Sequence, residues 1–136
     1  MDAGQEEDFI LTKMEVTPMT SAVADAVTLS FEFEVKKVIK QGTWTPKFII
    51  DASAKRRILE FYTTAGKEYQ PGSYKEELKI DQVDVSGAKK SELLNTGLFV
   101  VSFKDGEDIV ADINMVTMMM PEGDGINKTI ISPLEQ

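Results

Sequence analysis

Few residue types in this 136-residue chain can carry out catalysis, because it contains no histidine and no cysteine. A Ser-His-Asp triad, a thiol nucleophile and a zinc site of imidazole or thiolate ligands are therefore excluded. Acid and base catalysis needs paired carboxylates, and the tightest acidic cluster consists of Asp105, Glu107, Asp108 and Asp112. Asp105 is typical of a turn, and Asp112 is typical of the polar side of a strand. The sequence thus predicts a protein that is not an enzyme and needs neither a cofactor nor a metal.

The overall composition also argues against several kinds of partner. A net charge of −8 disfavours binding to nucleic acid, because that affinity depends on lysine and arginine displacing counterions from phosphates. No apolar run approaches the ~20 residues of a membrane-spanning helix, so integral membrane association is not expected. The lack of cysteine and of a recognisable signal peptide predicts a cytoplasmic location. A Ca²⁺-dependent membrane-binding module is the least favoured alternative, because the acidic cluster lacks the spacing of a calcium loop.

Positive charge is concentrated between residues 36 and 57, where only Asp51 opposes it. The segment also contains Trp44, and an aromatic side chain beside cations is a common interface anchor. We expect this basic segment to bind an acidic protein partner or an anionic membrane surface. The alternative is a set of solvated strand edges, on which lysine discourages edge-to-edge pairing. The candidate binding residues are Lys36, Lys37, Lys40, Trp44, Lys47, Lys55, Arg56 and Arg57.

A methionine-rich stretch near the C-terminus forms the second candidate surface. Consecutive side chains point to opposite faces of a strand, so some of these methionines must be exposed or line an opening. Methionine is common at adaptable binding surfaces, although a core strand that runs into a covered loop gives the same composition. The candidate hydrophobic pocket or surface consists of Phe48, Phe61, Met115, Met118, Met119 and Met120. Trp44 is either a core anchor or the wall of a groove.

Alternating apolar and polar residues predict the elements that must position these side chains. Residues 27–35 alternate strictly, and residues 98–113 form a hairpin around Asp105-Gly106. We expect a turn at residues 41–43 and one helical turn within residues 89–95. The predicted fold is an all-β, antiparallel, immunoglobulin-like sandwich of about 7–9 strands, with residues 1–8 as a flexible acidic start and residues 9–136 as one domain. Its predicted core includes Phe31, Phe33, Phe99, Val101 and Phe103.

Several short segments occur in an order known from one family. They are the alternating strand at residues 28–35, the Gly72-Ser73-Tyr74 turn, the acidic strand start at residues 75–78 and the glycine-led hairpin at residues 97–108. This order resembles that of the Rho GDP-dissociation inhibitors and the related phosphodiesterase delta subunit. The resemblance implies a sandwich that binds a lipid tail or a protein. No counterpart of the inhibitors' N-terminal arm precedes Phe9, and residues 111–115 lack the aromatic side chains of the family's last strand.

Two functions from different classes follow. The first is a non-catalytic adaptor that binds a protein partner through a sheet face or edge. The second is a small carrier that shields the hydrophobic group of a lipid-modified protein between its sheets. A carrier needs an internal cavity, whereas an adaptor is filled to the density of an ordinary core. We favour the adaptor, because aromatic residues and isoleucine occupy nearly every inward position.

Overall fold

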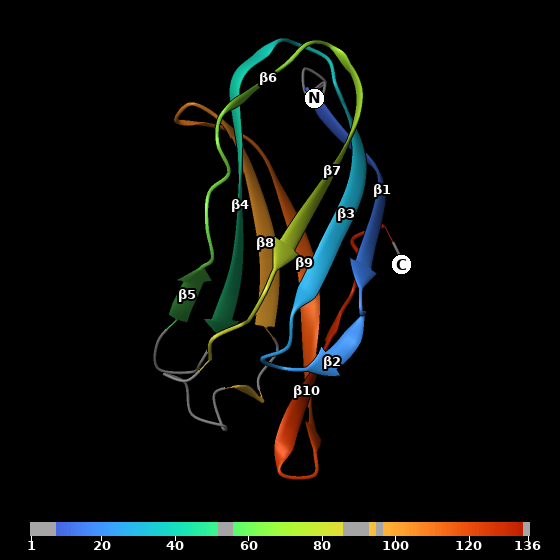
Figure 1. Cartoon of the computed structure of the whole chain (residues 1–136), viewed down its shortest axis with the longest axis vertical. Helices are drawn as coiled ribbons and strands as arrows, with labels where there is room; N and C mark the ends of the chain where they lie inside the picture. Colours follow the sequence, from blue (N-terminus) through green and yellow to red (C-terminus); the bar gives the residue numbers. More distant parts are fainter. Residues whose placement is uncertain (1–7, 52–55, 86–92, 95–96, 135–136) are drawn as a thin grey trace.

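The computed structural model describes residues 8–51, 56–85, 93–94 and 97–134. All ten elements of the described residues are strands, and they form two antiparallel sheets that face each other (Figure 1). The chain is therefore an all-β antiparallel sandwich, as the sequence predicts. The ten strands exceed the predicted seven to nine. Two of them, β2 and β6, are only three residues long.

The smaller sheet contains three strands in the spatial order β1 (Phe9–Thr17), β3 (Val27–Val35) and β7 (Gly72–Ile80). Strand β3 lies in the middle, and its apolar residues are buried while the residues between them are partly exposed. This burial pattern follows from the period of two, which places alternate side chains on opposite faces. The register between β1 and β3 shifts between Leu11 and Lys13, so β1 carries an irregularity near its centre.

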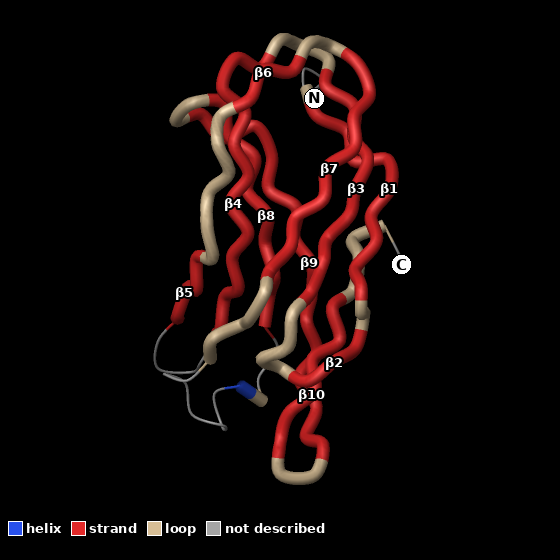
Figure 2. Tube along the Cα trace, viewed as in Figure 1, coloured by secondary structure: helices blue, strands red, loops and turns tan. Residues whose placement is uncertain are grey.

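The larger sheet contains the remaining strands (Figure 2). Its spatial order is β2 (Thr20–Ala22), β10 (Gly125–Ile130), β9 (Asp108–Glu122), β8 (Gly97–Asp105), β4 (Ile39–Asp51) and β5 (Arg56–Glu60). Strand β6 (Lys67–Tyr69) also pairs with β4, near the start of that strand. Strands β8 and β9 form the predicted hairpin, and Gly106 has the positive φ of 63° that its tight turn requires.

The core lies between the two sheets and confirms the predicted set. None of the five predicted core residues is more than 2% exposed. The five largest fully buried side chains of the described residues are aromatic, and the rings of Trp44 and Phe103 stack with their centroids 4.0 Å apart. Rings from both sheets take part, because Phe31 and Phe33 of β3 lie 4.9 and 5.2 Å from Trp44. Aromatic packing therefore joins the two layers.

The turn predicted at residues 41–43 is wrong, because these residues belong to β4, whose pairing with β6 is irregular between Ile39 and Gly42. Gly42 has a different role from that of a turn glycine. A Cβ atom at this position would lie 2.8 Å from the Tyr69 ring and 2.9 Å from the Phe103 ring. Gly42 is therefore the place where two aromatic rings approach the backbone of β4. The helical turn predicted within residues 89–95 falls mostly outside the described residues, as do residues 1–7 of the predicted flexible start.

Pro46 lies in the middle of β4 and explains where β5 ends. Proline has no N–H to donate, so it fits a strand only where that donor is not needed. The carbonyl of Pro46 accepts a hydrogen bond of 3.0 Å from the N–H of Phe61, the first residue after β5. Hydrogen-bonded pairs alternate along an antiparallel ladder, so Phe61, Leu59 and Arg57 direct their backbone groups toward β4. Those of Glu60 and Ile58 point away from it.

Candidate interaction surface

A row of aliphatic side chains crosses the outer face of the larger sheet. Strand register places these residues directly opposite one another, and the N–H of Ile131 donates to the carbonyl of Val116 at 3.0 Å. The row, called the aliphatic row below, consists of Ile58 (β5), Ile49 (β4), Leu98 (β8), Val116 (β9) and Ile131, which follows β10. Five strands spaced about 4.8 Å apart make it roughly 19 Å wide. Ile58 is 56% exposed and Val116 is 49% exposed.

The methionines of β9 divide between the two faces of the sheet. Met115 and Met119 are buried, whereas Met118 and Met120 are 46% and 54% exposed on the same face as Val116. The alternation predicted for this stretch is thereby confirmed. The exposed pair extends the aliphatic row along β9 toward the β9–β10 hairpin, which projects at the bottom of Figure 1. The predicted methionine site is thus half core and half surface.

The remaining phenylalanines of that predicted site belong to the interior. Phe48 is fully buried, and its ring stacks on Phe99 at 4.6 Å. Phe61 is half-buried and lies 6.1 Å from the same ring. Neither side chain joins the exposed methionines, so these six residues do not form one pocket.

Beyond the aliphatic row, the outer face of the larger sheet mixes polar and apolar side chains, since Val100 of β8 lies between Lys47 and Asn114. Beside the aliphatic row, Lys47 of β4 lies opposite Glu60 of β5. Further along, Thr45 and Thr63 share a hydrogen bond of 2.8 Å in a hollow of about 310 Å³. The outer face therefore has an aliphatic row beside a region in which polar side chains predominate.

The outer face of the smaller sheet is mainly polar and carries charges of both signs. Lys13, Glu32 and Lys75 lie opposite one another, and the ammonium of Lys75 is 3.9 Å from the Glu32 carboxylate. The neighbouring row places Ser30 between two glutamates, and its hydroxyl lies 3.5 Å from Glu77. These charges largely compensate one another across the strands, which is typical of a solvated sheet face.

The structure does not gather the basic segment into one patch. Lys36, Lys37 and Lys40 are exposed around the start of β4, where Lys37 forms an ion pair of 3.2 Å with Asp8. At the other end of β4, Arg56 pairs in register with Asp51. Eleven residues of extended strand separate Asp51 from Lys40, which corresponds to about 36 Å. Lys55 and the side chain of Arg56 lie outside the described residues.

Two other members of the basic segment point to the inner side of the larger sheet. Arg57 is half-buried on the inner side of β5, opposite Ile50. Trp44 is 2% exposed within the aromatic core, so its predicted role as a surface anchor is wrong. The physical reason is the strand period, which directs Trp44 inward together with Phe48, while Lys47 points outward. An indole next to cations in the sequence need not share their face.

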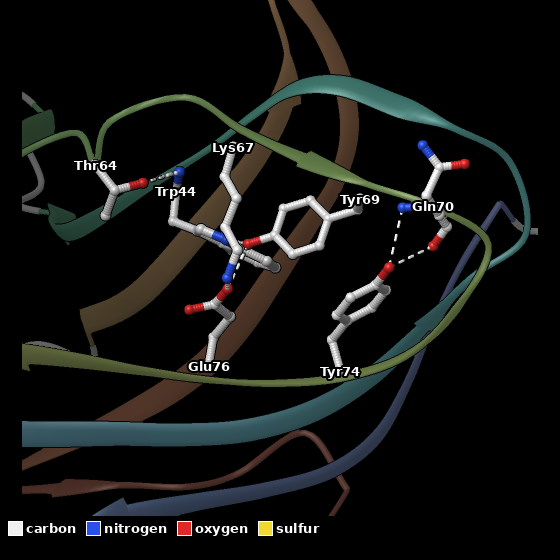
Figure 3. A network of polar contacts seen from close by, with 7 residues as sticks. All are labelled: Trp44, Thr64, Lys67, Tyr69, Gln70, Tyr74 and Glu76. Carbon is white, nitrogen blue, oxygen red and sulfur yellow. Dashed lines mark hydrogen bonds and ion pairs between the residues drawn. The ribbon is translucent and has the colours of Figure 1, made fainter.

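A polar network ties the two sheets together beside the aromatic core (Figure 3). The indole N–H of Trp44 donates to the Tyr69 hydroxyl at 3.0 Å, and that hydroxyl donates to the carboxylate of Glu76. Lys67 completes the network with its ammonium 3.3 Å from Glu76 Oε2. Burial, followed by the hydrogen bond to Glu76, raises the pKa of Tyr69 above its usual value. Because Trp44 and Tyr69 belong to the larger sheet and Glu76 to the smaller one, the network holds this end of the sandwich closed.

Lys128 is a buried residue that reasoning from the sequence missed. Its ammonium donates to Ser21 Oγ at 3.0 Å and to the carbonyls of Ala22 and Asp25 at 2.7 and 2.9 Å. These bonds hold β2 and the loop after it against β10. Burial lowers the pKa of Lys128 to about 8. The available signal was its inward position in the alternation between Ile126 and Ile130.

Two kinds of feature are absent from the described part of the chain. No three carboxylates there converge as a group able to hold a metal ion. None of its elements is a helix long and apolar enough to cross a membrane.

The sequence matches no model of a known protein family, and a comparison with curated proteins gives no significant match. The resemblance to the Rho GDP-dissociation inhibitors therefore stays a prediction based on the order of elements.

Proposed function

We propose that the protein is a non-catalytic interaction module that binds a protein partner on the outer face of its larger sheet. The aliphatic row carries this proposal. An exposed sheet face normally presents polar side chains, and a contiguous apolar patch on one marks an interaction site. Met118 and Met120 add adaptable side chains to the same face.

A protein partner suits this surface better than a lipid tail or an anionic membrane. The space between the sheets is filled by aromatic contacts beside Trp44, and the polar network resists separation of the sheets there. The β9–β10 hairpin ends in Glu122 and Asp124, which anionic lipid would repel. We therefore infer a partner that presents aliphatic side chains of its own.

The test replaces aliphatic side chains by charges on the proposed face. The double variant Val116→Lys/Met118→Lys should retain its fold, because both side chains are about half exposed. Asn114→Lys is the matched control, since Asn114 is exposed on the same face of β9. Affinity capture from the source cells, with quantitative mass spectrometry, compares the three proteins. We expect partners that are retained by the wild type and the control and lost from the double variant.

Salt and native mass spectrometry separate this proposal from the alternatives. Capture through an aliphatic face should survive about 0.5 M salt, whereas capture through lysines should weaken as charges are screened. Partners captured equally well by the double variant would contradict the proposed face. A lipid retained by the purified protein would instead favour the carrier.

A further inference from the structure

The larger sheet ends in an open edge at β5 (Figure 2). The ladder with β4 directs the backbone N–H and carbonyl groups of Ile58 and Glu60 toward this edge, as the bond between Phe61 and Pro46 establishes. Ile58 is also the most exposed member of the aliphatic row. An open edge with directed backbone groups and an apolar side chain is a template for another strand.

The other edges carry features that hinder strand addition. In β1 the register shifts between Leu11 and Lys13, which disrupts a regular ladder. In β7 the backbone carbonyl of Lys79 already accepts a hydrogen bond of 2.9 Å from the hydroxyl of Tyr62. Strand β2 is only three residues long. Among the described strands, β5 therefore offers the most accessible edge.

The sequence of β5 is complementary to itself. Antiparallel pairing of two copies centred on Ile58 places Ile58 opposite Ile58 of the second copy, and Arg56 opposite Glu60 of the second copy. The three residues that direct their backbone groups outward, Arg56, Ile58 and Glu60, then all fall at hydrogen-bonded positions. Opposite charges at facing positions stabilise such a pair, and the Arg-Arg-Ile-Leu-Glu sequence supplies them at both ends.

We propose that two copies of this chain associate through antiparallel pairing of their β5 strands. The pair has twofold symmetry, and it joins the two larger sheets into one continuous sheet. The aliphatic row then runs across both molecules, because Ile58 stands at its end in each copy. The edge contact uses the backbone of β5, whereas the partner face is tested at Val116 and Met118. The two sites share Ile58, but each proposal has its own test and either can fail without the other.

The experiment measures molecular mass by sedimentation over about a hundredfold range of concentration, since a pair forms by mass action. The wild type should pass from the mass of one chain to that of two. Ile58→Pro removes an N–H that points away from β4, and it should raise the dissociation constant at least tenfold. Ile58→Val keeps that N–H and is the matched control, with a dissociation constant close to that of the wild type. Circular dichroism checks the fold of each variant.

A charge reversal keeps the proposal testable if Ile58→Pro does not fold. Glu60→Arg places two arginines opposite each other and should weaken pairing severalfold, whereas Arg56→Glu/Glu60→Arg should restore it. A wild type that keeps the mass of one chain at the highest concentration overturns the proposal. A dimer that neither Glu60→Arg nor Ile58→Pro weakens also overturns it, because the contact then lies elsewhere. Val116→Lys/Met118→Lys should leave pairing unchanged, which separates this result from the test of the partner face.

Discussion

Lys128 makes the stability of the protein depend on pH in a direction that can be worked out from the structure. Its pKa is about 8 in the folded state and 10.5 when the side chain is exposed. Between these values the unfolded chain binds more protons than the folded one, so the free energy of unfolding rises as pH rises. One site with these two pKa values contributes about 2 kcal/mol between pH 7 and pH 9.5. We expect about 1 to 2 kcal/mol, because relaxation of the surrounding groups lowers the cost of burying the charge.

The assay is urea unfolding followed through the fluorescence of Trp44, the only tryptophan. Stabilities extrapolated to zero urea at pH 7, 8, 9 and 9.5 are compared between the wild type and Lys128→Met. The methionine variant cannot titrate at this position, so the difference between the two curves isolates Lys128. Parallel curves for the two proteins, or a wild type that loses stability relative to the variant as pH rises, would refute the reasoning.

Two further predictions concern the aromatic core. Phe103→Ala removes the ring that stacks on Trp44 at 4.0 Å and should lower the free energy of unfolding by about 3 to 5 kcal/mol; a loss below about 1 kcal/mol would contradict its core position. Gly42→Ala should cost about 1 to 3 kcal/mol, because the new methyl group would lie 2.8 Å from the Tyr69 ring. Unchanged urea midpoint and Trp44 fluorescence in Gly42→Ala would show that the rings move aside freely.

The fold was accessible from the sequence because strand alternation is a local signal. The strict alternation of residues 27–35 and the Asp105-Gly106 turn each depend only on neighbouring residues, and the structure confirms both. Gly42 was misjudged because its reason is distant. The rings that occupy the space of a side chain at this position belong to Tyr69 and Phe103, which lie far away in the sequence.

The candidate surface was accessible only in part. The sequence shows that consecutive methionines must divide between two faces, but strand register decides that Val116 meets Leu98 and that Leu98 meets Ile49. Register depends on tertiary pairing, so the aliphatic row could not be found along the chain. The basic segment illustrates the opposite error. Charges that are close in sequence lie far apart once a thirteen-residue strand extends between them.

The two ends of the larger sheet are unequal, and this inequality limits how the protein can aggregate. Growth of a fibril requires two usable edges on every molecule, because each molecule that is added must leave a site for the next. Strand β5 offers five residues at one end, whereas β2 offers three at the other and is fixed to Lys128. A molecule with one usable edge completes its assembly when that edge is filled. The short β2 strand therefore works against open-ended growth through the edges of the larger sheet.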